Sequence, residues 1–212
     1  MTALSRSSIL ARMKSRELFI SPILGTDQLG MSSVDLRMGT VALVARAGAQ
    51  SHVDPNAYAN APMQAHGAME GKKQKHERFD IPFGESFLLH PGSLALVPTL
   101  EWVLLPGDLQ GVVTARSSWA REGLNIATAT IVNPGYTGIV TLELANFGQI
   151  PIKLYPGLRL AQIAFYDLHR ADPARDDEHL KKQGQFQMAF EPSAGDIAKK
   201  DEAFLSKGPG RT

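Results

Sequence analysis

Proline–glycine corners divide most of this chain into short apolar runs, and they restrict the folds open to it more than any other feature. They recur as HPGS at 90–93, LPGD at 105–108, NPGY at 133–136 and YPGL at 155–158. The runs between them, such as SLALVPTLEWVLL and GIVTLELANF, are rich in β-branched residues, which is typical of strands bounded by tight turns. Many short strands with such turns indicate a sandwich or a barrel. The sequence therefore predicts a mainly β fold, built as a distorted antiparallel barrel.

A short helix is predicted ahead of the strands. Residues 7–20 place apolar side chains at roughly helical spacing behind Ser7 and Ser8, either of which can serve as the N-cap. The apolar residues are Ile9, Leu10, Met13, Leu18 and Phe19. With 212 residues in total, and about 150 residues per domain as the prior, we expect one domain over residues 1–168.

Two segments carry no such pattern. Residues 46–76 are rich in Ala, Gly, Gln and His and show no apolar face, so we expect a long excursion from the barrel. Residues 169–212 are polar and charged and cannot build a core of their own. We expect them to form a flexible tail that orders on a ligand or on a neighbouring subunit.

Composition excludes several classes of protein. The 22 Lys and Arg residues nearly balance the 21 Asp and Glu residues, which gives a net charge of +1. The chain as a whole therefore has no strong electrostatic attraction for a nucleic acid polymer or an anionic membrane. The chain has no cysteine, which excludes disulfides, thiolate nucleophiles and sulfur-ligated zinc. The six histidines show no metal-ligand spacing.

The chain carries no recognisable export or membrane signal. Basic residues interrupt the N-terminal stretch where a signal peptide would need an apolar core. They are Arg6, Arg12, Lys14 and Arg16. The most apolar stretch, residues 94–105, contains Pro98 and Glu101 and falls short of the roughly 20 residues of a membrane helix. We therefore expect a cytoplasmic protein.

The segment ARSSWAREG at 115–123 has the composition of a phosphate-binding loop. It follows a strand-like run and brings together Arg116, Ser117, Ser118 and Arg121, whose hydroxyl and guanidinium groups, together with main-chain N–H groups, suit an anion. The alternative is that Ser117 caps a helical turn and that both arginines are solvated at its surface.

The segment TATIVNPGYTGIVTLELAN at 128–146 carries a carboxylate on a strand-like run. Counting by two places Ile139, Thr141 and Glu143 on one face, with Val140, Leu142 and Leu144 on the other. Glu143 thus points away from the more apolar face. It is either a surface glutamate or a pocket carboxylate that faces the 116–121 loop, and alternation does not choose between the two.

Taken in order, these segments resemble a known family. RSSWAREGL, TATIVNPGYTGIVTLE, IPIKLYPGLRLAQIAF and KKQGQ, with SSVDLRMG and LLHPGSLALVPTLEWVLLP upstream, are similar to the dCTP deaminases of the trimeric dUTPase superfamily. The resemblance runs in register from about residue 8 to residue 185. It implies a dUTPase-like barrel or jelly roll and a homotrimer whose active sites lie between subunits.

The resemblance also implies a reaction, the deamination of dCTP to dUTP and ammonia without zinc, which agrees with the lack of cysteine. Glu143 would act as the base toward the attacking water. Ser117 and Arg121, with the main chain of Ala129, would hold the water and the tetrahedral adduct. The remaining members of the 116–121 loop, Arg116 and Ser118, would bind the triphosphate.

Further positions are implied by motif matching. Tyr136 would lie under the deoxyribose and exclude a 2′-hydroxyl, although an aromatic ring at this place can also simply pack on its own hairpin. The other nucleotide-binding positions would be Asn133, Thr141, Leu142, Lys181 and Gln185. Mg²⁺ would bind through the triphosphate oxygens, and dTTP is expected as an inhibitor.

Four residues depart from the family pattern. The aspartate of the IDPG motif is Asn133 here, and an amide cannot serve as a base, which disfavours hydrolysis of dUTP. Trp119 replaces the leucine of RSSL, Lys182 replaces the tyrosine of KYQGQ, and Ala174 stands where a tyrosine is usual. The alternatives are therefore a bifunctional deaminase and dUTP diphosphatase or a dUTPase, and a deoxynucleotide-binding module without turnover.

Overall fold

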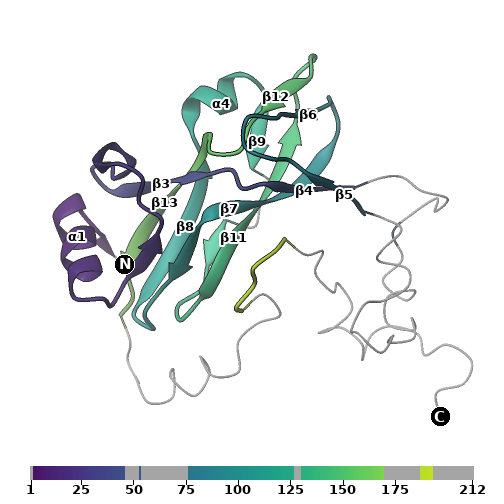
Figure 1. Cartoon of the computed structure of the whole chain (residues 1–212). Helices are drawn as coiled ribbons and strands as arrows, with labels where there is room; N and C mark the ends of the chain where they lie inside the picture. The colour runs from purple at the N-terminus through teal and green to yellow at the C-terminus, as the bar shows by residue number, and fades with distance from the viewer. Residues whose placement is uncertain (1, 46–52, 54–75, 127–129, 170–186, 193–212) are drawn as a thin grey trace, which may run out of the picture.

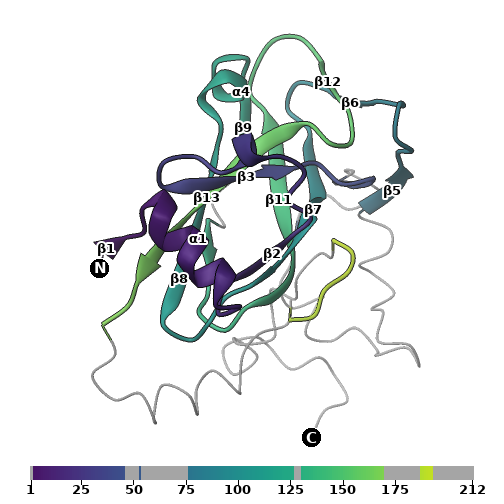
Figure 2. The ribbon, with the colours of Figure 1, turned by 60° about the vertical axis from the view of Figure 1, so that its left-hand side comes forward.

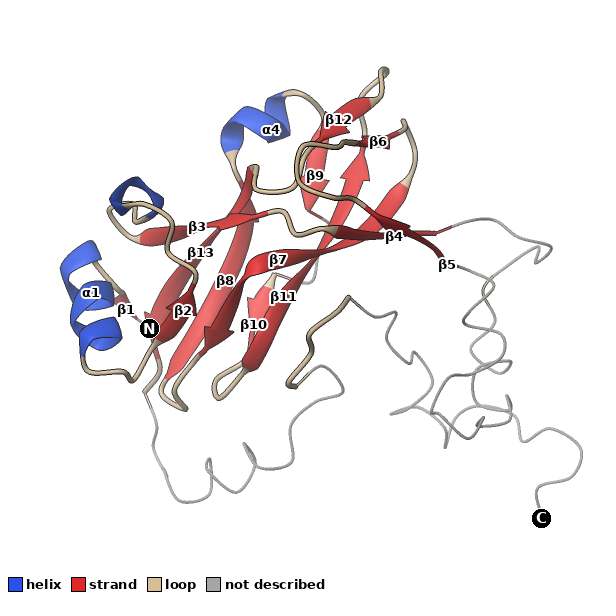
Figure 3. Ribbon diagram, in the orientation of Figure 1, coloured by secondary structure: helices blue, strands red, loops and turns tan. Residues whose placement is uncertain are grey.

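Antiparallel strands dominate the computed structural model, which describes residues 2–45, 53, 76–126, 130–169 and 187–192. Figure 3 shows the strands and the few short helices. The helices are α1 (Arg6–Lys14), η1 (Thr26–Gln28) and α4 (Ser117–Arg121). The strands are β1 (Thr2–Ala3), β2 (Phe19–Ser21), β3 (Ser33–Arg37), β4 (Val41–Ala45), β5 (His76–Asp80), β6 (Phe87–Leu89), β7 (Leu94–Leu104), β8 (Leu109–Ala115), β9 (Leu124–Ile126), β10 (Ile131–Val132), β11 (Thr137–Asn146), β12 (Ile152–Leu154) and β13 (Arg159–Asp167).

The strands form two main sheets that curve around a shared core (Figure 2). One sheet has the order β1-β13-β8-β10, with β3 also paired to β13. The other has the order β5-β4-β7-β11-β9, with β2 also paired to β7, and β12 with β6 makes a small third sheet. The predicted mainly β fold, a distorted antiparallel barrel or jelly roll, is confirmed.

The proline–glycine corners at 90–93, 133–136 and 155–158 are tight turns, as predicted. In each, the N–H of the fourth residue donates to the carbonyl of the first, over 3.1–3.2 Å. Proline supplies the fixed φ of the second position, and the third position needs a positive φ. Gly92 and Gly135 both have φ of +72°. A side chain at either position would strain the turn, which explains the recurring dipeptide.

The N-terminal helix differs from its prediction at both ends. Its N-cap is Ser5, whose hydroxyl accepts from the N–H of Ser8, and the helix stops at Lys14. Leu18 and Phe19 belong to the next segment, and Phe19 begins β2, which pairs with β7. Periodicity overestimated the helix because apolar spacing does not distinguish a last helical turn from the start of a short strand.

Within the described ranges, no helix has the length and hydrophobicity of a membrane span. Of the predicted excursion at 46–76, only Val53 and His76 are described, and His76 begins β5. Of the predicted tail at 169–212, His169 and residues 187–192 are described. The other residues of both segments lie outside the described part of the chain.

Candidate functional site

The 116–121 loop forms the single turn of helix α4 directly after β8 (Figure 1). Arg116 is its N-cap, with extended backbone angles. Ser117, Ser118 and Arg121 are exposed, and their side chains form no hydrogen bond or ion pair with another described residue. Three of the four predicted residues therefore present unused donors to solvent.

Strand β13 holds this turn in place. The Arg116 N–H donates to the Leu160 carbonyl over 3.0 Å, and the Trp119 indole Nε1–H donates to the Arg159 carbonyl over 2.9 Å. Trp119, a departure from the family motif, therefore has a structural role here. Its half-buried ring packs on the core while its N–H fixes α4 to the neighbouring strand.

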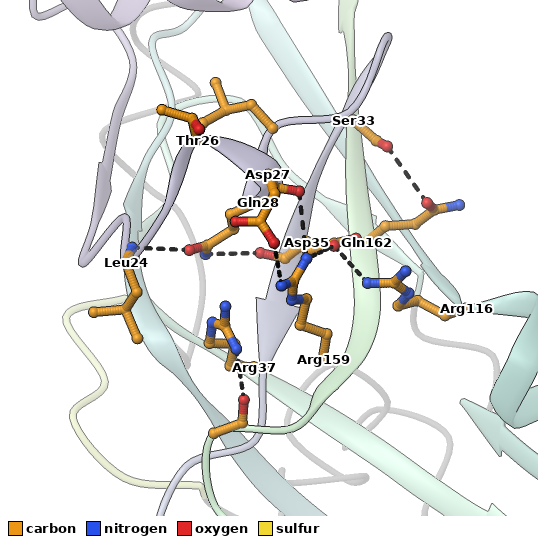
Figure 4. Close-up of polar contacts among 12 residues, drawn as sticks. Leu24, Thr26, Asp27, Gln28, Ser33, Asp35, Arg37, Arg116, Arg159 and Gln162 are labelled. Carbon is orange, nitrogen blue, oxygen red and sulfur yellow. Dashed lines mark hydrogen bonds and ion pairs between the residues drawn. The ribbon is translucent and has the colours of Figure 1, made fainter.

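A cluster of charges that sequence reasoning missed lies beside α4 (Figure 4). The Asp35 carboxylate accepts from Arg116 over 2.5 Å and from Arg159 over 3.4 Å. Arg159 also pairs with Asp27, and this ion pair is the main cause that lowers the pKa of Asp27. The signal in the sequence was the aspartate of SSVDLRMG, between two apolar residues of β3, but only the tertiary structure shows its partners.

A buried carboxylate lies behind this cluster. Glu101 on β7 is 0% exposed, and its two oxygens accept from the Gln28 amide and from the Arg37 main-chain N–H, both over 2.8 Å. Burial raises the pKa of Glu101 above its usual range. The Gln28 amide also donates to the Asp35 carbonyl over 3.0 Å, so Glu101 helps to fix the strand that carries Asp35.

Strand β11 carries Glu143 half-buried, with Leu142 and Leu144 in the core. The predicted alternation holds from Thr141 to Leu144. It fails at Ile139 and Val140, which are both buried, because the register with β7 shifts between Ile139 and Thr141. The two-residue alternation of side chains along a strand does not predict where such a bulge occurs.

The main chain of Thr141 and Glu143 points to the edge of β11 that faces away from β7. The Val140 N–H donates to Thr99 of β7, and the Asn146 N–H donates to Ser93, which precedes β7. Main-chain polar groups alternate between the two edges of a strand, so Thr141 and Glu143 face the opposite edge. Among the described residues, strand β9 pairs with this edge at residues 144–146.

Leu142 does not share this edge. By the same alternation its main-chain groups point toward β7, where it pairs with Val97, and its side chain is 1% exposed. Of the predicted nucleotide-binding residues on β11, Thr141 therefore directs its main-chain groups to the edge that faces away from β7, whereas Leu142 contributes to the core beneath it.

The Asn133–Tyr136 turn precedes β11. The Tyr136 hydroxyl donates to the Ile139 carbonyl, and burial raises the pKa of Tyr136 to about 12. The half-buried ring packs against the core, and part of it stays accessible. Asn133 is exposed, which leaves its amide available at the mouth of the turn.

Residues 187–189 pack against this same turn. The Gln187 side chain accepts from the Thr137 N–H over 3.0 Å and donates to the Gly135 carbonyl over 3.3 Å. The Met188 N–H donates to the Thr137 carbonyl, and the Ile139 N–H donates to the Ala189 carbonyl. These residues occupy the edge of β11 at 137–139, on the side away from β7.

Ala129, Lys181 and Gln185, and the departures Ala174 and Lys182, lie outside the described residues. The remaining predicted positions form two groups, one on α4 and one on β11 with its preceding turn. Among the described residues, no hydrogen bond or ion pair joins the two groups. The described ranges also hold no cluster of three or more His, Asp or Glu side chains suited to a metal ion.

Comparisons with known proteins match this arrangement to one family. The model of the family described as dCTP deaminase-like matches residues 3–168. A protein of Dictyoglomus thermophilum named "dCTP deaminase, dUMP-forming" is 35% identical and covers 94% of this chain and 98% of its own length. A protein of Halorubrum lacusprofundi named dCTP deaminase is 35% identical, over 94% of this chain and 93% of its own length.

A crystal structure of 2′-deoxycytidine 5′-triphosphate deaminase from Agrobacterium tumefaciens shares the fold. Its TM-score is 0.58 at 24% identity, and it covers 85% of this chain. The present chain spans about half of that longer chain, 52%. The family model and the curated relatives both match most of the sequence. The chain therefore belongs to the dCTP deaminase-like family.

Proposed function

We propose that this protein deaminates dCTP to dUTP and ammonia. The observation that carries the proposal is the family match over residues 3–168, joined to Glu143, a half-buried carboxylate on β11 next to the strand edge that faces away from β7. The curated relatives act, by their names, on dCTP.

The proposed chemistry begins at C4 of the cytosine ring. Glu143 takes a proton from water as the water oxygen forms a bond to C4. Glu143 passes this proton to N3 of the ring. The remaining proton of the new C4 hydroxyl then passes to the amine, the C4–N bond breaks, and ammonia leaves with a carbonyl at C4. The described residues give Glu143 no ion-pair partner, so its carboxylate stays available as a base. The proposed route uses no zinc, in keeping with a chain that has no cysteine.

Donors on α4 complete the proposed site. Ser117 and Arg121, with the main chain of Ala129, hold the water and the developing oxyanion, and Arg116 and Ser118 bind the triphosphate. Within the described part of one chain, no hydrogen bond or ion pair joins α4 to Glu143. We place the donors on α4 and Glu143 of each site on different subunits of a homotrimer, as the resemblance to the family implies.

The rest of the proposed site recognises the sugar and closes over the phosphates. Tyr136 and Asn133 contact the deoxyribose, and the edge of β11 at Thr141 contacts the base. Lys181 and Gln185 contact the phosphates and sugar. Mg²⁺ enters with the nucleotide, because phosphate oxygens are the hard ligands that it prefers. We place dTTP as an inhibitor at the same site and the enzyme in the cytoplasm.

A second candidate is the bifunctional enzyme that releases dUMP, because the Dictyoglomus relative is named as dUMP-forming. Asn133 argues against it. Cleavage of the phosphate chain needs a group that activates water, and an exposed amide cannot accept a proton at neutral pH. We therefore propose dUTP as the product.

The experiment is incubation of chelator-treated protein with dCTP and Mg²⁺, with dUTP, dUMP, ammonia and pyrophosphate followed together. Ammonia with accumulating dUTP supports the proposal. Ammonia with dUMP and pyrophosphate supports the bifunctional enzyme and removes the argument from Asn133. No ammonia at all, with dCTP still bound, refutes deamination and indicates a nucleotide-binding module.

A further inference from the structure

Asp35 joins two arginines that reach it from different elements (Figure 4). Its Oδ2 accepts from Nη1 of Arg116, at the start of α4, and from Nη1 of Arg159 on β13. The Asp35 side chain is 14% exposed, whereas that of Arg116 is 35% exposed. A carboxylate so largely withdrawn from water needs paired charge, and the two guanidinium groups supply it.

The backbone of Asp35 is the fixed partner in this contact. It lies in the middle of β3, opposite Gln162 of β13, and its carbonyl accepts from the buried Gln28 amide. Arg116 is a long side chain that loses considerable rotamer freedom when it is held in place. A rigid carboxylate therefore orients a mobile guanidinium, and not the reverse.

The two arginines depend on Asp35 to different degrees. Arg159 keeps a second carboxylate, Asp27. Among the described residues, Asp35 is the one carboxylate that pairs with Arg116. Loss of Asp35 would therefore release Arg116 while Arg159 stays anchored.

We propose that Asp35 is a positioning residue for Arg116: it holds the guanidinium through one nitrogen so that the remaining N–H groups face the triphosphate. This inference rests on the proposed function, in which Arg116 binds phosphate. Arginine recognises phosphate through a planar fork of donors, and a fork that is already oriented loses less freedom when the nucleotide binds.

The negative charge of Asp35 has an effect on nucleotide binding that opposes its effect on the orientation of Arg116. Asp35 is negative and would repel phosphate, but it is shared between two guanidinium groups, so the three side chains together carry one net positive charge. Removing Asp35 would raise that charge and free Arg116 at the same time. We expect the loss of orientation of Arg116 to outweigh the gain in positive charge, so that nucleotide binding is weaker without Asp35.

The test compares Asp35→Ala and Asp35→Asn with Asp27→Asn as the matched control. We expect Asp35→Ala to raise KM for dCTP about tenfold, because it removes a hydrogen bond to a charged group, with kcat within twofold of the wild type. Asp35→Asn has nearly the same shape and keeps an oxygen that accepts from Arg116, so it should recover most of the affinity for dCTP. This variant also keeps the test valid if Asp35→Ala does not fold. Asp27→Asn changes a partner of Arg159 only and should leave KM unchanged.

A double-mutant cycle with Arg116→Ala decides whether Asp35 acts through Arg116. In the Arg116→Ala background, the added Asp35→Ala change should have no further effect on KM. An equal increase of KM in both backgrounds would overturn the proposal, as would tighter binding of dCTP by Asp35→Ala or a loss confined to kcat.

Direct binding of dCTP, measured by calorimetry, separates this inference from the proposed function. If the wild type binds dCTP but releases no ammonia, the deaminase proposal fails. The positioning role of Asp35 is then tested by the same double-mutant cycle, with the Kd for dCTP measured in place of KM. If the wild type deaminates dCTP and both Asp35 variants keep its KM, the positioning role fails alone. A wild type that binds no dCTP refutes both.

Discussion

At the scale of single residues, the proposed chemistry depends most on Glu143. Glu143→Gln keeps the shape of the side chain and removes its ability to accept a proton. We expect ammonia release from dCTP to fall by about a hundredfold to ten-thousandfold, with dCTP binding retained in calorimetry. Glu122→Gln, at an exposed glutamate just after α4, is the control and should turn over normally. Normal turnover by Glu143→Gln would remove Glu143 from the mechanism.

Glu101 supports the site without touching it. Its oxygens accept from two N–H donors, and neither donor can turn away. The Arg37 donor is main chain, and the Gln28 amide is held by contacts with Leu24 and Asp35. Glu101→Gln therefore places an NH₂ group opposite a donor, and we expect the free energy of unfolding in urea to fall by about 1–3 kcal/mol. A loss no larger than that of Glu122→Gln would contradict the buried contacts.

Tyr136 predicts a pH dependence of stability. Burial raises its pKa from 10 to about 12, so between these values the unfolded chain loses a proton that the folded chain keeps. The contribution of Tyr136 to the free energy of unfolding is fully present below pH 10. It is lost as the pH rises toward 12, by up to about 2 kcal/mol. Tyr136→Phe lacks this loss, although it gives up the hydrogen bond to Ile139.

The measurement is the midpoint of urea unfolding at pH 8 and at pH 11. We expect Tyr136→Phe to be less stable than the wild type at pH 8 and the gap to narrow at pH 11. Tyr155→Phe, at an exposed tyrosine, should show the same gap at both values. A constant gap for Tyr136→Phe would mean that the hydroxyl is not buried as described.

At the scale of elements, the segment 187–191 is a short addition to the edge of β11. Its ring contact places Phe190 against Trp102 with centroids 4.7 Å apart, and Glu191 pairs with Arg78 over 2.7 Å. An aromatic pair contributes about 0.5–1.5 kcal/mol. Residues 187–191 are exposed or half-buried at the margin of the sheet, so the segment can open without unfolding the barrel.

Phe190→Ala should therefore increase opening of this segment by up to about tenfold. Limited proteolysis, followed by mass spectrometry, should show faster cleavage near residues 187–191, while the unfolding midpoint of the barrel stays near that of the wild type. Phe83→Ala removes a phenylalanine of similar exposure, 66% against 73%, and should not change cleavage there. Equal cleavage rates in all three proteins would argue against a docked segment.

At the scale of the whole molecule, sites shared between subunits can be tested by complementation. Glu143→Gln and Arg121→Ala should each be inactive alone. In randomly mixed oligomers, a site that takes its glutamate from one chain and its arginine from another is intact in about a quarter of cases. Co-expressed variants should then recover about a quarter of wild-type ammonia release. No recovery, in oligomers shown to be mixed, would place both residues of a site in one chain.

Much of this architecture could be predicted from the sequence because it depends on local rules. Proline and glycine restrict backbone angles wherever they stand, so the turns at 90–93 and 133–136 followed directly from composition. Alternation along β11 correctly buried Leu142 and Leu144. Periodicity failed where two elements met within a few residues, as at the end of α1, and where the ladder with β7 shifted at Ile139.

The sequence by itself determined the β architecture, its turns and the family, because each rests on local backbone preferences or on motifs in register. Only the tertiary structure decided which side chains meet. Asp35 and Arg116 are separated by 81 positions, Gln28 and Glu101 by 73, and Gln187 and Thr137 by 50. No local preference encodes such pairs, because they arise when strands distant in sequence become neighbours in one sheet or around one core.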